Sequence, residues 1–245
     1  MKDGLLTHIW FIGFLSTFAG ISIGGVIAGL INGFKRSIGT IYAVCTGLIL
    51  GLISFEIAPE AIQLGNWLIF LLGFLAGVFI FNLIHMGVHN NSVITKASHK
   101  HHNRRLGLFL ALIISIHNFP MGIVLGAGEQ SQLSISLLQA LLLHNIPEGM
   151  ILFTPLFIAG FSFNMLFFLS IFIAVPVALG AFFGEMIGMQ NNLLWAFLIS
   201  LTVGTIYMVT IKEILTESIR QSSNTYSFLV AFIAFWLMGA YLFYY

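Results

Sequence analysis

Two stretches decide the fold: LGLFLALIISIHNFPMGIVLGA at residues 106–127 and ISLLQALLLHNIPEGMILFTPLFI at residues 135–158. Each stays largely apolar for about 20 residues, which is enough for an α-helix to cross a ~30 Å hydrocarbon core. Lipid offers no water to backbone groups, so a membrane span is either a helix or part of a closed barrel. Neither stretch alternates between apolar and polar residues, and both are therefore predicted to be membrane-spanning helices.

The composition extends this interpretation to the whole chain. Of 245 residues, 59% are hydrophobic and only 7% are charged, and the mean hydropathy is +1.03. Soluble domains are about 45–50% apolar and about 25% charged. These values exclude a water-soluble globular protein, a disordered chain and a nucleic-acid-binding protein. The formal net charge of +1 implies no polyanionic partner, and the single cysteine, Cys45, can form no internal disulfide.

Apolar windows predict an all-α, polytopic membrane protein with eight helices in a single transmembrane domain, residues 1–245. Eight of the nine Lys and Arg residues fall in the connections after the first, third and seventh helices. Basic connections stay in the cytoplasm, so loop 89–105 is predicted to be cytoplasmic and both termini extracytoplasmic. The predicted helices are approximately 5–31, 38–62, 66–88, 106–127, 135–158, 164–188, 193–213 and 227–245.

The fourth and fifth helices carry the same polar string, HNFPMG at 117–122 and HNIPEG at 144–149. The two histidines lie roughly 14–16 Å into their spans, near the bilayer centre. Polar side chains at that depth are costly and mark functional sites by default. Each proline also frees a backbone carbonyl four residues earlier, a break that is tolerated beside protein, water or an ion.

These strings predict a divalent metal site at the membrane midplane. His144 and Glu148 are four residues apart and share one helix face, and imidazole with carboxylate suits Zn²⁺, with Fe²⁺, Mn²⁺ and Cd²⁺ as alternatives. The alternative is that these residues only form hydrogen bonds between helices. Such packing does not require the same string at the same depth in two helices. The candidate ligands are His117, Asn118, Met121, His144, Asn145 and Glu148.

A second repeat involves acidic residues. Glu56 and Glu60 near the end of the second helix match Glu213 and Glu217 of the seventh, each pair separated by the same 157 residues. The two helices run in opposite directions, which is the pattern of an inverted repeat with three helices, a central pair and three helices. We expect the four carboxylates to form the entrance and exit of a cation path. Solvated helix ends are the alternative for Glu60 and Glu217.

Histidines are dense in and around the predicted cytoplasmic loop. Clustered imidazoles can bind metal transiently or sense its concentration. The basic residues in the same stretch repel cations, however, and already explain the loop as a topology anchor. Both interpretations stay open for His89, His99, His101 and His102.

Taken together, HNFPMG, HNIPEG and GTIYMVTIKEILTESI (204–219) resemble the ZIP (Zrt-, Irt-like protein) family of divalent metal transporters, in its bacterial type. The resemblance implies metal uptake into the cytoplasm across the plasma membrane, elevator-like or rocking alternating access, and a homodimer. Many bacterial members carry acidic residues where this chain has Met121 and Val175, and some where it has Asn145. Those departures favour one bound metal over two.

The leading hypothesis is therefore a transporter of Zn²⁺ or a similar dication and not an enzyme. Metal is its cargo, no cofactor is needed, and the sequence contains no nucleotide-binding motif. An intramembrane zinc-dependent hydrolase with Glu148 as general base is the runner-up, but it lacks a third firm ligand. A metal-sensing receptor without ion flux is a third possibility.

Overall fold

The structure is a computed structural model that describes residues 8–31, 38–89, 99–127, 132–187 and 191–244. Within these ranges the chain is helical and contains no strand. Eight of the helices there are long and apolar enough to cross a membrane, which confirms the predicted all-α polytopic fold. The elements are α1 (Ile9–Ile31), α2 (Ile38–Leu52), η3 (Ile53–Ile57), α3 (Ala58–Leu64), α4 (Trp67–His89), α5 (His99–Ala127), α6 (Gln132–Ile158), α7 (Phe163–Ile187), α8 (Asn192–Val209), η4 (Thr210–Leu215), α9 (Thr216–Gln221) and α10 (Asn224–Tyr244).

Two helix boundaries differ clearly from the prediction. Residues 99–105, expected in the cytoplasmic loop, form the first turns of α5, and the seventh span continues beyond 213 to Gln221. Neither extension contains Gly or Pro, so nothing in the sequence breaks the backbone hydrogen bonds where the apolar run ends. Hydropathy marks where a helix leaves lipid and not where the helix itself ends.

Two spans contain a π-helical turn. The second span runs from α2 through η3 into α3, and the seventh runs from α8 through η4 into α9. A π turn inserts an extra residue into an α-helix and often occurs at functional sites. η3 contains Glu56 and η4 contains Glu213, so both turns carry the acidic residues that the sequence repeat pairs.

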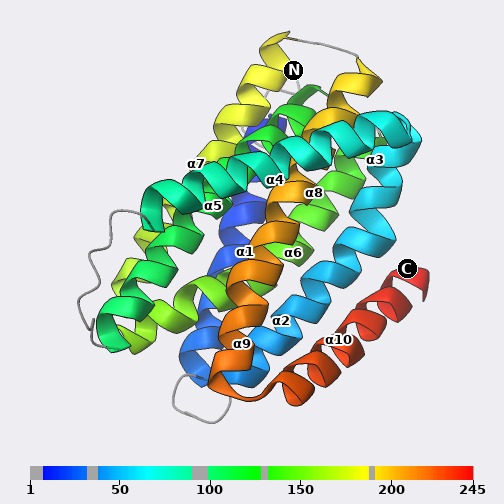
Figure 1. Cartoon of the computed structure of the whole chain (residues 1–245). Coiled ribbons are helices and arrows are strands. Elements are labelled where there is room, and N and C mark those ends of the chain that lie inside the picture. Colours follow the sequence, from blue (N-terminus) through cyan, green and yellow to red (C-terminus); the bar gives the residue numbers. More distant parts are fainter. Residues whose placement is uncertain (1–7, 32–37, 90–98, 128–131, 188–190, 245) are drawn as a thin grey trace.

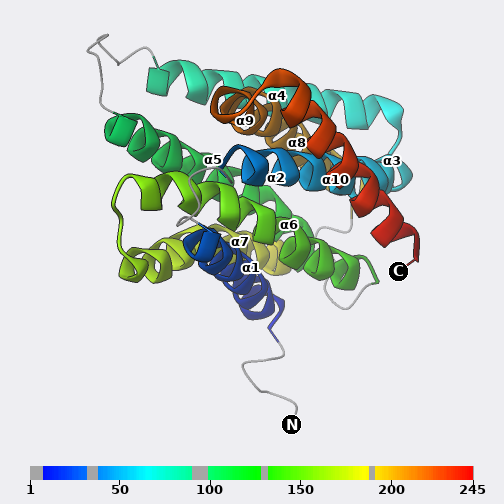
Figure 2. The same cartoon turned by 90° about the horizontal axis from the view of Figure 1, so that it is seen from below.

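The helices pack in two groups (Figures 1 and 2). In the first group α5 packs on α7, α1 packs on both α6 and α7, and α5 contacts α6. In the second group α4 packs on α8 and α2 packs on α10. The groups meet where α5 contacts α8 and where α2 contacts α6. The two helices with the HNxPxG strings thus belong to one group and lie at its boundary with the other.

These pairs are related by an exchange of helices. The helices can be exchanged in four pairs: α1 with α7, α2 with α8, α4 with α10, and α5 with α6. This exchange converts each packed pair named above into a packed pair from the same set. An internal repeat produces this relation because both halves fold in the same way. The order of three helices, a central pair and three helices is compatible with these pairs and stays a prediction.

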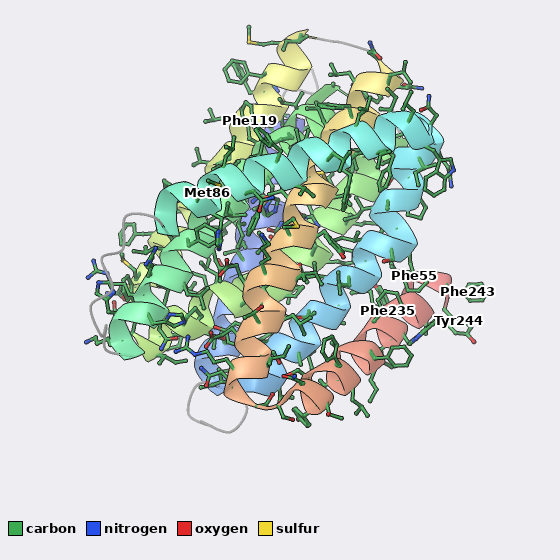
Figure 3. All side chains as sticks on the ribbon, viewed as in Figure 1. Phe55, Met86, Phe119, Phe235, Phe243 and Tyr244 are labelled. Carbon is green, nitrogen blue, oxygen red and sulfur yellow. The ribbon has the colours of Figure 1, made fainter. Side chains whose placement is uncertain are left out.

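Large apolar side chains cover the outside of the bundle. Met86, Phe119 and Phe243 point away from it (Figure 3) and are 57%, 36% and 86% exposed. A soluble monomer rarely exposes apolar surface this extensively, whereas lipid would cover it.

Glycine brings α1 and α6 into backbone contact. A Cβ atom at Gly24 would lie 2.8 Å from the Met150 amide nitrogen and 2.9 Å from Gly149 Cα, and would also collide with the Ile146 carbonyl oxygen. Such close approach is the usual role of small residues between membrane helices, where van der Waals packing replaces the hydrophobic effect. The contact fixes α6 immediately beside its HNIPEG string.

The same contact recurs between α7 and α5. A Cβ atom at Gly180 would meet the Phe119 carbonyl oxygen, the Ile123 amide nitrogen and Gly122 Cα. These residues precede Ile146, Met150 and Gly149 by 27 positions, the interval that also separates His117 from His144. Both motif helices are therefore held in the same way against a glycine of a neighbouring helix.

We predict that Gly24→Ala destabilises the protein, because its Cβ has no room against the α6 backbone. Overpacking of this kind costs about 1–3 kcal/mol, which thermal unfolding of the purified protein in detergent would register as a lower Tm. Gly87→Ala is the matched control, since a Cβ there meets nothing within 4 Å. Equal Tm values for the two variants would contradict this account of the α1–α6 contact.

Candidate metal centre

The HNxPxG residues of α5 and α6 are buried together in the bundle. His117 Nε2 lies 3.2 Å from Glu148 Oε1, so α5 and α6 bring these two predicted ligands together. The predicted ligands are all at most 2% exposed: His117, Asn118, Met121, His144, Asn145 and Glu148.

Many polar atoms of this cluster are buried without a hydrogen-bond partner. They are both ring nitrogens of His117 and of His144, Oδ1 of Asn118 and of Asn145, and Oε2 of Glu148. The contact between His117 and Glu148 has an ion-pair distance but not the angles of a hydrogen bond. Each unsatisfied buried polar group costs about 1–3 kcal/mol. A cation accepting these lone pairs would remove that cost.

Hydrogen bonds leave the oxygen atom of each asparagine available. The Asn118 amide nitrogen donates to the Ile173 carbonyl oxygen of α7 at 3.4 Å. The Asn145 amide nitrogen donates to the Leu141 carbonyl oxygen in its own helix. Because the two donors are occupied, Oδ1 is the atom that each asparagine can offer to a metal.

The second helix group reaches this cluster through Thr202 of α8. The Thr202 hydroxyl lies within hydrogen-bonding distance of two carbonyl oxygens, 3.3 Å from that of His117 and 3.1 Å from that of Leu198. The Thr202 hydroxyl thus links the second helix group to the backbone of α5 at His117, a predicted ligand. The candidate centre lies at the boundary between the two groups.

The six side chains are not all gathered at one point. Among the residues that the structure describes, no three His, Cys, Asp or Glu side chains converge closely enough to hold a metal ion. His117 and Glu148 are in contact, and His144 follows one turn before Glu148 on the same helix. The structure therefore buries all six predicted ligands and brings one pair of them, His117 and Glu148, into contact.

Glu56 of η3 borders a cavity of about 370 Å³. One carboxylate oxygen, Oε2, is buried without a hydrogen-bond partner. The cavity extends to Gln139 and Leu143 of α6, and Leu143 is the residue whose carbonyl Pro147 displaces. The Phe55 ring packs 4.9 Å from that of Phe235 on α10, centroid to centroid (Figure 3), and forms one wall.

Glu213 of η4 occupies a different environment. His85 Nε2 of α4 lies 3.2 Å from Glu213 Oε1, and the neighbouring Lys212 ammonium donates to Asn82 Oδ1 at 2.9 Å. His85 is not among the candidate residues that the sequence predicted. The position of His85 near the end of α4 could have suggested this pair. The end of α4 lies at the same end of the bundle as the end of the seventh span.

The family model described as "ZIP Zinc transporter" matches residues 88–244, more than half of the sequence. The chain belongs to the ZIP family. Members of this family transport zinc and other divalent metals and are not enzymes. The match includes both HNxPxG strings and Glu213. It does not favour the hydrolase alternative. No curated protein matches the sequence.

In this ZIP chain the last predicted path residue, Glu217, is 5% exposed and fully engaged. Its carboxylate lies 3.4 Å from His102 Nε2 and 3.6 Å from Arg220 Nη1, and accepts a hydrogen bond from Gln221 at 2.7 Å. Arg220 Nη1 is also 2.8 Å from His102 Nε2. The network joins the start of α5 to α9, and so links the two helix groups at this end.

The other loop histidines have separate outcomes. His101 lies at the start of α5 beside a cavity at this end of the bundle. The side chains of His89 and His99 lie outside the described residues. His102 is the loop histidine whose contacts the structure gives, and those contacts are an ion-pair network. Metal binding by the loop stays a prediction.

We predict that Glu217→Ala lowers stability by about 1–2 kcal/mol, because it removes a buried carboxylate from charge-assisted bonds whose partners are partly exposed. Thermal unfolding of the ZIP protein in detergent measures the effect. Glu60→Ala is the control, since Glu60 is the repeat counterpart of Glu217 but is half-buried, and we expect a change within about 0.5 kcal/mol. A larger loss of stability in Glu60→Ala than in Glu217→Ala would refute this role for the network.

Proposed function

We propose that this ZIP protein carries Zn²⁺ across the membrane through a site formed by His117, His144 and Glu148. The observation that carries the proposal is the set of buried, unpartnered donor atoms on the two proline-interrupted helices. In a water-free interior such atoms need a ligand or they destabilise the fold. Fe²⁺, Mn²⁺ and Cd²⁺ are the alternative cargoes. Asn118, Asn145 and Met121 complete the proposed coordination.

The two acidic turns mark the two ends of the proposed path. The cavity at Glu56 leads towards Leu143, next to His144, and serves as the extracytoplasmic entrance. Glu213 with His85 serves as the exit, because a carboxylate and an imidazole together can accept a borderline dication. Glu60 and Glu217 lie one turn beyond each of these residues. Negative charge at the Glu56 and Glu60 end raises the local concentration of cations at the entrance.

The charge distribution gives the orientation of the proposed path in the membrane, and the ZIP family suggests uptake as its direction. Connections that carry eight of the nine Lys and Arg residues stay in the cytoplasm, so Glu213 faces the cytoplasm and Glu56 the outside. We propose uptake across the plasma membrane, with both termini extracytoplasmic and a homodimeric assembly. Alternating access would move the helix group of α5 and α6 against the group of α8, breaking the contacts of Thr202 and His102.

Metal flux into proteoliposomes tests the function and the site together. We predict saturable Zn²⁺ uptake by the wild type and flux at background for both His144→Ala and Glu148→Ala, because each variant loses a charged or imidazole ligand. His8→Ala is the control, since that side chain is half exposed at the start of α1, and it should keep wild-type flux. Size-exclusion and thermal profiles would show that each variant is folded.

Two outcomes of this experiment would count against the proposal. A wild-type protein that is folded but moves none of Zn²⁺, Cd²⁺, Fe²⁺ or Mn²⁺ would refute transport. Full flux in a His144→Ala, Glu148→Ala double variant would refute the site and leave transport intact.

Met121 predicts a preference among metals. Thioether sulfur binds soft ions and adds little for hard ones, and in the repeat Met121 occupies the position that Glu148 has in the other motif. We predict that Met121→Leu, which keeps the volume but removes the sulfur, lowers the ratio of Cd²⁺ to Mn²⁺ flux by a few-fold. An unchanged ratio would show that Met121 is a packing residue.

A further inference from the structure

The start of α5 carries a cavity that the transport path does not use. Its volume is about 390 Å³, and α5 alone provides the residues that define it. They lie along one stripe of the helix, since positions 101, 105, 108 and 112 recur at helical spacing. The lining residues are His101, Arg104, Arg105, Leu108, Phe109 and Leu112.

The stripe changes from basic to apolar along its length. Residues 99–105 read HKHHNRR, and the continuous apolar run starts at Leu106. The helix therefore leaves the hydrocarbon near Arg105, with the basic residues at headgroup level and the leucines below them. Leu108 and Leu112 are 43% and 40% exposed inside the membrane-spanning part. A ligand that fits this stripe has an anionic end and an apolar end.

The basic side chains are held in place by their neighbours. The Arg104 guanidinium carbon lies 5.9 Å from the centre of the Phe161 ring, on the α6–α7 connection. Arg105 is near enough to Glu213 for their charges to interact, while Glu213 also has His85 at 3.2 Å. The lining residues include no acidic side chain. A single anionic group would thus meet a net positive rim.

Glu217 of α9 does not cancel this positive charge. Glu217 is already engaged with His102, Arg220 and Gln221. Lys100 and Arg104 both reach the α6–α7 connection, since the Lys100 ammonium would lie 3.4 Å from a Cβ atom at Gly160 and Arg104 lies over Phe161, but the cavity lining includes Arg104 and not Lys100. Lys100 therefore belongs to the same helix turn as the rim but does not line the cavity.

We propose that this cavity binds one anionic phospholipid. An acyl chain lies in the apolar cavity along Leu108, Phe109 and Leu112, and the headgroup phosphate lies at its edge, beside the basic residues His101, Arg104 and Arg105. Basic pockets at the headgroup level of membrane proteins recognise anionic lipids in this way. A free phosphate could bind beside the basic residues but would leave the apolar residues of the cavity uncovered. An acyl chain covers those residues, which favours a lipid over a free phosphate. The proposal rests on the membrane span of α5 and not on the metal site.

Native mass spectrometry of the full-length protein tests the proposal directly. The probes are phosphatidylglycerol and phosphatidylcholine with the same acyl chains, added to protein in detergent. We expect phosphatidylglycerol to stay bound preferentially to the wild type. Arg104→Gln should lower its affinity roughly five-fold, the effect of one basic side chain beside an anionic lipid. Lys100→Gln removes the same charge from the same helix but from outside the cavity lining, and should lower the affinity less than Arg104→Gln does.

A second pair of variants tests the apolar residues of the cavity without changing charge. Leu108→Trp fills the cavity and should also reduce phosphatidylglycerol binding, whereas Leu83→Trp, at a residue of α4 that is 53% exposed and outside the cavity lining, should not. Equal retention of the two lipids, equal losses in Arg104→Gln and Lys100→Gln, or full displacement of the lipid by glycerol phosphate would overturn the proposal. Zn²⁺ flux is not needed for any of these measurements.

Discussion

The absence of water in the membrane interior is the constraint on which the rest of this structure depends. Every polar atom placed there must find a partner or lower the stability of the fold. Most of the chain meets this requirement with uninterrupted apolar helices. The HNxPxG segments of α5 and α6 do not, because imidazole nitrogens, amide oxygens and a carboxylate oxygen are buried there without partners. The glycine contacts of α1 with α6 and of α7 with α5 hold this costly cluster in position.

The two halves of the repeat share a scaffold but differ in chemistry. Glycine contacts on α5 and α6 match at an interval of 27 residues, yet the fifth position of one motif is Met121 and that of the other is Glu148. The π turns differ in the same manner. Glu56 borders a cavity and leaves one oxygen unpartnered, whereas Glu213 has His85 beside it. The two ends of the proposed path therefore offer a cation different partners.

Much of the fold could be predicted from sequence because hydropathy and span length are local properties. The eight spans follow from them, and the repeated strings identified six side chains, five polar and one thioether, that the structure buries. The extension of α5 back to His99 was missed because hydropathy does not report where a helix ends in water. The pairing of His85 with Glu213, and that of His102 with Glu217, depends on how α4, α5 and the seventh span pack together. Spacing within one helix carries no information about such contacts.

The central claim is that a divalent metal binds between α5 and α6 at the middle of the membrane. Anomalous diffraction from crystals grown with Zn²⁺ tests it most directly, because the signal locates the metal independently of any transport assay. The account predicts a peak about 2.0–2.2 Å from a ring nitrogen of His117, a ring nitrogen of His144 and a carboxylate oxygen of Glu148. A well-occupied Zn²⁺ peak elsewhere in the protein, with none between these three side chains, would contradict it.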